Sequence, residues 1–235
     1  VHAILSRRVD GLIIAPASSD AAPLQPLLRA GVPFVIVDRR VPGVDADLVL
    51  GDSVDGARLL AEHLLSRGHR RISHLGGPCG LSTADEREEG YRQALAAAGV
   101  ELEPRWVQRG EYKQEAGYRL MQVCLDQPPL PTAVLAANNA LAVGALMALR
   151  ERGLNVPRDM ALVCFDDLPQ ASQIDPFLTV AAQPAYEFGV TAVRLLLARL
   201  SDPSRPPETV VLPPELIVRR SSGSPYWTVP LDTIH

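Results

Sequence analysis

Three polar residues that could bind a small ligand stand at the ends of short apolar runs. They are Asp38 in PFVIVD, Asn138 in TAVLAANN and Asp166 in MALVCFDD. If the runs are parallel strands, these residues lie at the carboxyl ends of the strands, where loops diverge and helix N-termini point into a crevice that can hold a ligand. An Asp or Asn at such a position can also cap the following helix. Capping therefore remains an alternative for each residue taken alone.

The sequence lacks the common motifs of enzyme chemistry. No GxSxG, P-loop, HExxH or strand-following GxGxxG pattern is present, and Schiff-base chemistry would depend on Lys113, the single lysine. Cys79, Cys124 and Cys164 are widely spaced without a CxxC pair, and the histidines are not clustered, so neither a disulfide framework nor a zinc site is expected. We therefore predict a binding protein that is not an enzyme and needs no cofactor or metal ion.

Apolar runs alternate with amphipathic helices, and this alternation predicts the fold class. The runs are Val9–Pro16, Pro33–Asp38, Ile72–Gly77, Thr132–Asn139 and Met160–Asp167. Four helices are expected to stop at glycines that can adopt a left-handed cap, namely Gly31, Gly68, Gly99 and Gly153. Continuous apolar runs indicate strands that are covered on both faces, as in a parallel sheet between helices. The sequence therefore predicts an α/β protein with doubly wound parallel sheets.

Composition and charge exclude several classes of protein. The 235 residues are 47% hydrophobic and 21% charged, which is typical of a globular protein and not of a disordered one. The net charge is −4 and the arginine pairs are scattered, so this chain alone is a poor candidate for binding the phosphate backbone of DNA. The longest uncharged run, residues 127–149, has prolines at its start and an Asn pair at its centre, which fits a buried strand and helix better than a membrane span. The first residues show no signal-peptide pattern, and we expect a cytoplasmic protein.

Eight segments together carry a family resemblance. In chain order they are VDGLIIAP, PFVIVDRR, LLSRGHRRISHLGGP, TADEREEGYRQAL, TAVLAANNALAVGALMAL, RGLNVPRDMALVCFDD, PFLTVAAQP and LPPELIVRRSS. They resemble the effector-binding core of the lactose/galactose repressor family of bacterial transcription regulators, over about Val1 to Ser222. The resemblance implies a periplasmic-binding-protein-like fold of type I, in which three crossovers join two α/β lobes and the ligand binds in the cleft between them.

The resemblance also implies a domain division. An N-terminal lobe would comprise residues 1–51 and 183–212, a C-terminal lobe residues 52–182 and 213–222, and a tail residues 223–235. The crossings would fall near 51–53, 182–184 and 213–214. Full-length relatives carry a helix-turn-helix domain, and then the first strand and helix of the N-terminal lobe, before the point where this sequence begins. We therefore expect the sequence to be part of a longer chain.

The family's binding site carries over to five positions. Arg87 in TADEREEGY matches an arginine that hydrogen-bonds effector hydroxyls or carboxylates. Asn138 matches an asparagine that both donates and accepts, and Asp166 matches a carboxylate that accepts from hydroxyls or amines. Tyr112 falls where the family places an aromatic ring that stacks on a sugar or base, although it could also be an ordinary surface or core aromatic. Asp38 matches a polar position of the N-terminal lobe that faces the cleft.

One position departs from the family pattern. Relatives usually have Asn-Asp where this chain has Asn138-Asn139. If the family's Asp caps the following helix, Asn139 can also do so, because Asn and Asp are near-equal N-caps. If the charge of that Asp helps to bind ligand, the effector preference of this chain is altered.

The resemblance implies the ligand-sensing core of a transcription regulator. A small effector, expected to be a sugar, with a nucleoside or purine as the runner-up, would change the operator affinity of an N-terminal helix-turn-helix domain that this sequence does not contain. The alternatives are a periplasmic sugar-binding protein of a transporter, which shares the fold but carries a signal peptide, and an enzyme. No membrane partner is expected.

A homodimer is also implied, because two DNA-binding heads must meet two half-sites. The expected contact surface includes Leu141, Val143, Leu146 and Met147, together with residues 172–177. The alternative is that these helix residues face their own sheet.

Overall fold

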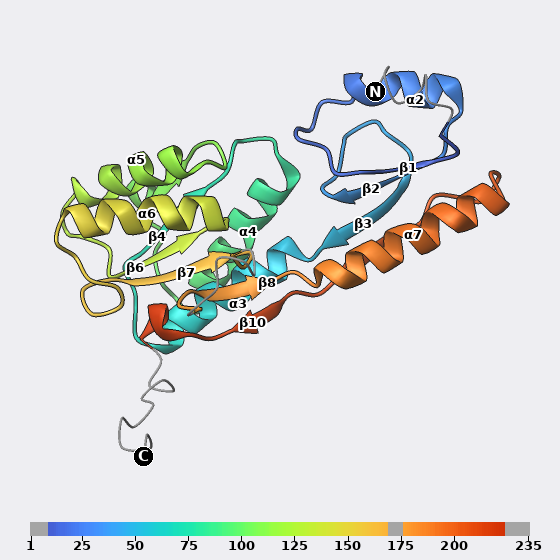
Figure 1. Cartoon of the computed structure of the whole chain (residues 1–235). Helices are drawn as coiled ribbons and strands as arrows, with labels where there is room; N and C mark the ends of the chain where they lie inside the picture. The colour runs from blue at the N-terminus through green and yellow to red at the C-terminus, as the bar shows by residue number, and fades with distance from the viewer. Residues whose placement is uncertain (1–8, 169–175, 224–235) are drawn as a thin grey trace, which may run out of the picture. The chain divides into compact units, whose positions relative to one another are not determined.

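The structure is a computed structural model that describes residues 9–168 and 176–223 (Figure 1). The chain forms two compact units. Unit 1 contains Val1–Asp52, Gly80–Thr83 and Gln183–Pro214, and unit 2 contains Ser53–Cys79, Ala84–Ala182 and Glu215–His235. The chain therefore passes between the units after Asp52, after Ala182 and after Pro214, and briefly returns to unit 1 at Gly80–Thr83.

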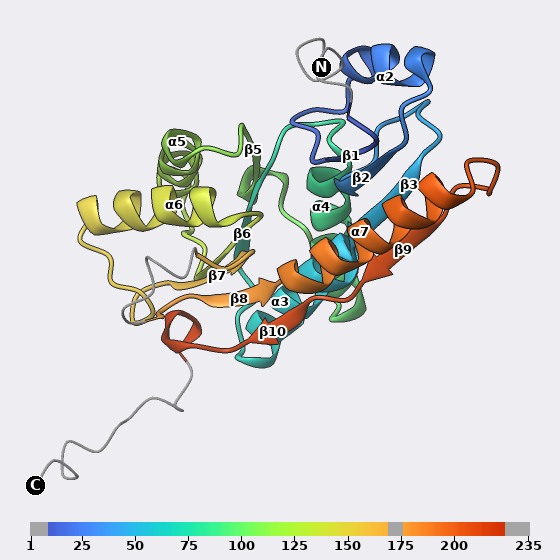
Figure 2. The same cartoon turned by 45° about the vertical axis from the view of Figure 1, so that its right-hand side comes forward.

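Unit 1 contains a four-stranded sheet in the order β1-β2-β3-β9, with every neighbouring pair parallel. The strands are β1 (Leu12–Ile14), β2 (Phe34–Asp38), β3 (Asp47–Gly51) and β9 (Thr209–Leu212), and the helices are η1 (Ala22–Leu24), α2 (Gln25–Ala30) and α7 (Ala185–Ser201). Phe34 and Ile36 of β2 pack with Leu27 of α2, whereas Val35 packs with Leu195 of α7. Figure 2 shows the strands of unit 1 between α2 and α7. Because β2 is covered on both faces, its apolar residues form a continuous run.

Unit 2 contains a six-stranded sheet in the order β10-β8-β7-β6-β4-β5. Its strands are β4 (Ile72–Gly76), β5 (Val107–Arg109), β6 (Ala133–Ala136), β7 (Ala161–Phe165), β8 (Thr179–Ala182) and β10 (Glu215–Ile217). Its helices are α3 (Ser53–Ser66), α4 (Ser82–Ala97, in unit 2 from Ala84 onwards), η2 (Pro104–Trp106), α5 (Gln114–Leu125), α6 (Asn139–Glu151) and η4 (Arg220–Ser222). The fold class predicted from the sequence, α/β with parallel sheets covered by helices, is confirmed.

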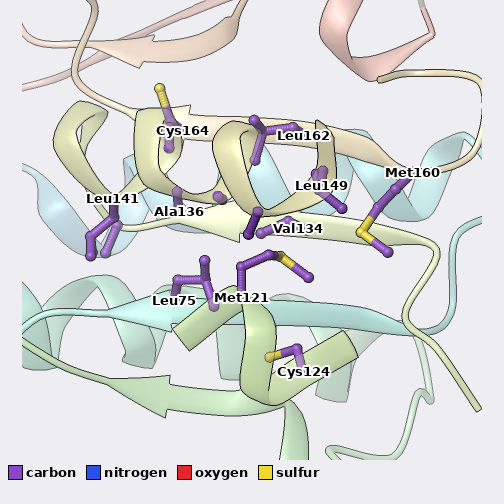
Figure 3. Close-up of a cluster of buried hydrophobic side chains, with 14 of the residues drawn as sticks. Leu75, Met121, Cys124, Val134, Ala136, Leu141, Leu149, Met160, Leu162 and Cys164 are labelled. Atoms are coloured by element: carbon purple, nitrogen blue, oxygen red, sulfur yellow. The ribbon is translucent and has the colours of Figure 1, made fainter. Parts of the chain in front are cut away.

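Two apolar cores lie on opposite faces of the unit 2 sheet. On one face, Leu75, Val134 and Leu162 meet Met121 of α5 and Leu149 of α6, as Figure 3 shows. On the other face, Leu60 and Leu64 of α3 and Leu95 of α4 pack with Leu135 and Val163 of the same strands. Because β4 to β8 run parallel, their carboxyl ends lie at one edge of the sheet, where the loops carry polar residues.

One strand departs from the parallel pattern. β10 pairs antiparallel with β8, with Glu215 opposite Ala182. The chain leaves unit 2 at the end of β8 and returns at the start of β10. Because β10 therefore begins where β8 ends, it runs in the opposite direction.

The predicted helix stops are confirmed, and all four glycines have positive φ, between 63° and 88°. The backbones of α5 and α6 approach each other closely at Gly144. A Cβ on this residue would lie 2.0 Å from the carbonyl oxygen of Gln114. Only glycine permits this approach of two backbones. The contact fixes α6, whose N-terminus carries a predicted site residue.

The proposed pairing surface on α6 is wrong at one residue. Leu141 is fully buried in its own core and cannot contact another copy, because that face of α6 packs on α5 and the sheet. Leu146 is partly buried against the same core, while Met147 is 48% exposed. Of the segment 172–177, residues 172–175 lie outside the described residues.

A buried histidine makes the stability of unit 2 sensitive to pH. His74 of β4 stacks on Tyr91 at 5.1 Å between ring centroids, and neither ring nitrogen has a hydrogen-bond partner among the described residues. Burial lowers the pKa of His74 to about 4, Glu88 acts in the opposite direction, and Arg109 and Arg92 add to the lowering. The histidine is therefore neutral in the folded protein near pH 7.

We expect the free energy of unfolding to fall as the pH drops from 6.5 towards 4. In that range the unfolded chain binds a proton at His74 that the folded chain does not, so stability rises with pH and is lost on acidification. From the pKa values of 6.5 and about 4, the loss between pH 7 and pH 5 is about 2 kcal/mol. Urea unfolding at both pH values, for the parent and His74→Leu, measures it. Equal pH dependence in the two proteins would contradict the assignment.

Candidate ligand-binding site

Four of the five predicted site residues belong to unit 2, at the carboxyl edge of its sheet. Arg87 comes from α4, Asn138 follows β6, and Asp166 follows β7. Tyr112 lies between β5 and α5, packed over Gly77 so closely that a Cβ there would be 2.4 Å from the ring carbon Cζ. Because β4, β6 and β7 are neighbours in the sheet, this edge brings the four residues together.

Arg87 is the centre of this group. Its Nη1 donates to the carbonyl oxygen of Ala137 at 2.6 Å and lies 3.5 Å from Oδ2 of Asp166. Its Cζ is 3.7 Å from the centroid of the Phe165 ring and 5.9 Å from that of Tyr112. The guanidinium thus lies over an aromatic face, a cation–π arrangement that arginine forms more often than lysine.

One edge of the Arg87 guanidinium lacks an acceptor among the residues that the structure describes. The residue is 3% exposed, and its buried Nε makes no hydrogen bond within the described part of the chain. The bonds from Nη1 leave the edge formed by Nε and Nη2, which is the edge that can donate to two acceptors in parallel. A buried donor without an acceptor is unfavourable, so the site favours a ligand that supplies oxygen atoms there.

Asn138 caps helix α6. Its Oδ1 accepts from the backbone amide of Leu141 at 2.9 Å, and its φ of −157° is extended. The sequence analysis considered Asn139 as a possible cap of this helix, and the structure shows that Asn138 is the cap instead. Asn139 is the first residue of α6, and its Nδ2 donates to the carbonyl oxygen of Asp167 at 2.9 Å. The Asn138 amide nitrogen retains its donors, so capping does not remove its capacity to bind ligand.

Asp38 and Asp166 share an unusual backbone conformation. Among the described residues they are the two non-glycine residues with positive φ, at 77° and 64°. Each follows a buried strand, and each was predicted as a site residue from its place at a strand end. Left-handed φ in a non-glycine residue costs free energy and is concentrated at functional sites. This strain is a second observation, independent of residue type, that points to the same two positions.

Asp38 belongs to unit 1, at the end of β2. Its Oδ2 accepts from Nη2 and Nε of Arg39 at 2.8 and 3.1 Å. Arg39 was not predicted as a partner, although its adjacency in the sequence is a signal that could have been used. The Asp38 carboxylate therefore forms an ion pair within its own unit.

Besides Arg39, the sequence prediction missed three further residues near the site, namely Phe165, Asp167 and Arg219. Phe165 stacks on Arg87, and Arg219 forms an ion pair with Asp167 at 2.6 Å between Nη2 and Oδ2. Nothing in the spacing of the RRSS motif indicates that Arg219 reaches the residue after Asp166.

No cluster of three or more potential metal ligands is found in the part of the chain that the structure describes.

A cavity of about 320 Å³ lies in unit 1, away from Asp38. It is lined at the amino end of the sheet by Phe34 and Asp47, with Leu27, Arg199 and Arg205 around it. Asp38 closes β2 at the opposite end, so this cavity is not part of the predicted site.

Comparison with known proteins places the chain among regulators. The periplasmic binding protein-like domain family matches residues 61–222. The chain is 35% identical over 218 residues to the HTH-type transcriptional repressor PurR of Escherichia coli O139:H28 (strain E24377A / ETEC), with 92% of this chain and 64% of the relative covered. The chain thus spans less than two thirds of that relative's length.

Two solved structures are similar in sequence and fold. A complex of the transcriptional regulator CelR with cellobiose is 35% identical with a TM-score of 0.85, covering 94% of this chain and 68% of the other. A LacI family transcriptional regulator from Enterococcus faecium with bound ribose is 30% identical with a TM-score of 0.82, covering 93% and 82%. These relatives are regulators and not enzymes. No helix among the described residues is long and apolar enough to cross a membrane.

Proposed function

The chain belongs to the LacI family of transcription regulators, and on that premise we propose that it is the effector-sensing core of a bacterial regulator. The core binds a small effector and thereby changes the operator affinity of an N-terminal helix-turn-helix domain. Operator DNA is contacted through that domain and not through these residues, whose net charge is −4. The regulator acts in the cytoplasm, where its operator lies.

The observation that carries this proposal is the Arg87 guanidinium, which is buried against Phe165 and whose Nε has no hydrogen-bond partner among the described residues. Beside it stand a carboxylate at Asp166 and a free amide donor at Asn138. A ligand with adjacent hydroxyl groups satisfies this set, because each hydroxyl can accept from Arg87 or Asn138 and donate to Asp166. Tyr112 offers a ring for the apolar face of the ligand.

We propose that the effector is a sugar. Support comes from the balance of donors and acceptors, and from the cellobiose and ribose in the two similar solved structures. We further propose Asp38 of unit 1 as an effector-binding residue. An effector shifts an equilibrium between two arrangements of the regulator by its differential affinity for them.

Isothermal titration calorimetry with a panel of monosaccharides, disaccharides and nucleosides tests the proposal. We expect at least one sugar to bind and to raise the melting temperature in parallel. If only nucleosides bind, the proposal of a sugar effector is rejected, whereas the proposal of an effector-sensing regulator stands. No binding by any compound, with the protein folded, would contradict the sensing role.

We further propose that the chain forms a homodimer through the exposed side of α6. We expect sedimentation at micromolar concentrations to give a dimer, and Met147→Glu to weaken it, because a charge would be buried in the contact. Val123→Glu on α5, where the side chain is 40% exposed, is the matched control. A monomeric parent, or equal weakening by both variants, would reject this surface.

A further inference from the structure

Asp167, the residue after Asp166, forms an ion pair with Arg219 near the C-terminal end of unit 2. Nη1 and Nη2 of Arg219 donate to Oδ1 and Oδ2 of Asp167 at 2.8 and 2.6 Å, a bidentate arrangement. The two side chains are 13% and 23% exposed, so water screens the pair only in part. The hydrogen bond to Asp167 raises the pKa of Arg219.

Both the side chain and the backbone of Arg219 form hydrogen bonds with residues 178 and 179. Its Nη1 also donates to the carbonyl oxygen of Leu178 at 3.0 Å. Its backbone amide donates to Oγ1 of Thr179 at 2.8 Å, and its carbonyl oxygen accepts from the same hydroxyl at 2.9 Å. The guanidinium therefore bonds Asp167 and the residue before β8, while the backbone of Arg219 bonds Thr179 of β8, so Arg219 is held at several points.

A second contact holds the backbone of Asp167. Nδ2 of Asn139 donates to its carbonyl oxygen at 2.9 Å. An Asp at position 139 would offer only acceptors and would face that carbonyl with a like partial charge. The amide side chain of Asn139 is therefore required for this contact.

The strained residue lies directly before these contacts. Asp166 has a φ of 64°, and its amide donates to the carbonyl oxygen of Ala181 at 3.0 Å. A left-handed Asp persists when its surroundings hold it in place. The side chain and the carbonyl of Asp167 supply that restraint from one side, and β8 supplies it from the other.

We propose that Asn139 and Arg219 are positioning residues that hold Asp167, fix the left-handed turn at Asp166 and so set the orientation of the Asp166 carboxylate towards the effector. The inference rests on the proposed function, since it assigns Asp166 as an effector ligand. Neither residue needs to touch the effector. Asn139 also ties the turn after β7 to the start of α6, where Asn138 stands.

Asn139→Asp separates positioning from stability. It places a negative charge at the N-terminus of α6, which leaves the free energy of unfolding unchanged or raises it through the helix dipole. It also removes the donor to Asp167. We therefore expect affinity for the bound sugar to fall about tenfold, as when groups that orient a ligating side chain are removed, while the urea midpoint does not fall. A merely structural residue would lower both together.

Arg219→Met removes the ion pair, and Arg219→Lys keeps a charge without the bidentate geometry. We expect the affinity for the sugar to fall about tenfold or more in Arg219→Met and by less in Arg219→Lys. Arg152→Met is the matched control, because Arg152 forms an exposed ion pair with Asp126 at 2.6 Å elsewhere in unit 2. Its sugar affinity should equal that of the parent.

Hydrogen exchange of the peptide covering residues 164–168 provides a readout that needs no effector. We expect faster exchange in Asn139→Asp and Arg219→Met than in the parent or Arg152→Met, because the turn is released. If no sugar binds the parent, the sugar proposal fails while this exchange still tests the support of the turn. Unchanged exchange in both variants, or unchanged affinity in both, would overturn the inference.

Discussion

Arg87→Met lowers effector affinity by about 100-fold, because truncating a buried, hydrogen-bonded charge costs about 2–5 kcal/mol of binding free energy. The Nε–Nη2 edge that would donate to the ligand is lost, and the Asp166 carboxylate loses its neighbouring positive charge. Calorimetric titration with the sugar found in the panel measures the change. Arg87→Lys should recover only part of the affinity, since an ammonium cannot donate to two acceptors in the same plane.

Arg92→Met is the matched control for this prediction. Arg92 lies on the same helix, is 46% exposed, and pairs with Glu88 at 2.6 Å. Arg109 also holds Glu88, at 2.7 Å, so that carboxylate stays paired. The control should bind the sugar as the parent does, and urea unfolding should show that both variants are folded. Equal sugar affinity of a folded Arg87→Met and the parent would remove Arg87 from the site.

Arg199→Met lowers the free energy of unfolding by about 3–5 kcal/mol, because it leaves a buried carboxylate without its countercharge. The Asp47 side chain is fully buried and accepts from Nε and Nη2 of Arg199 at 3.0 and 3.1 Å. The same guanidinium donates to the carbonyl oxygens of Pro203, Arg205 and Pro206 and so ties the loop after α7 to β3. Urea unfolding of unit 1 measures the loss.

Two further variants show whether the lost countercharge is the cause. Arg158→Met breaks an exposed pair with Asp159, in which Arg158 is 75% exposed, and should cost less than about 1 kcal/mol. The double variant Asp47→Leu/Arg199→Met should regain part of the stability, since the unpaired buried charge is gone. If Arg199→Met costs no more than Arg158→Met, the buried pair does not stabilise unit 1 in this way.

The strands and helix stops were predictable because local rules determine them. Continuous apolar runs mark strands that helices cover on both faces, and glycine after a helix marks a left-handed cap, as at Gly31 and Gly153. The antiparallel direction of β10 was not predictable from such rules, since it follows from where the chain crosses between units. The burial of Leu141 depends on the close packing of α5 on α6, which a helical pattern alone does not specify.

The candidate site was predictable in part for a similar reason. Strand ends indicated Asp38, Asn138 and Asp166, because parallel strands place such residues at one edge of a sheet. The stacking of Phe165 on Arg87 and the support from Arg219 join segments that are distant in the sequence. No spacing rule connects such segments, so these contacts emerge only when the sheet order is known.

Operator affinity measured with and without the effector shows whether this site controls DNA binding. The measurement is fluorescence anisotropy of labelled operator DNA, titrated with the full-length regulator that carries the helix-turn-helix domain, for the parent and for Asp166→Asn. Asparagine tolerates left-handed φ as aspartate does, so this variant removes the charge and keeps the turn. We expect the sugar to change operator affinity by about 5- to 150-fold in the parent and by much less in Asp166→Asn. An equal change in both proteins would contradict the claim that this site senses the effector.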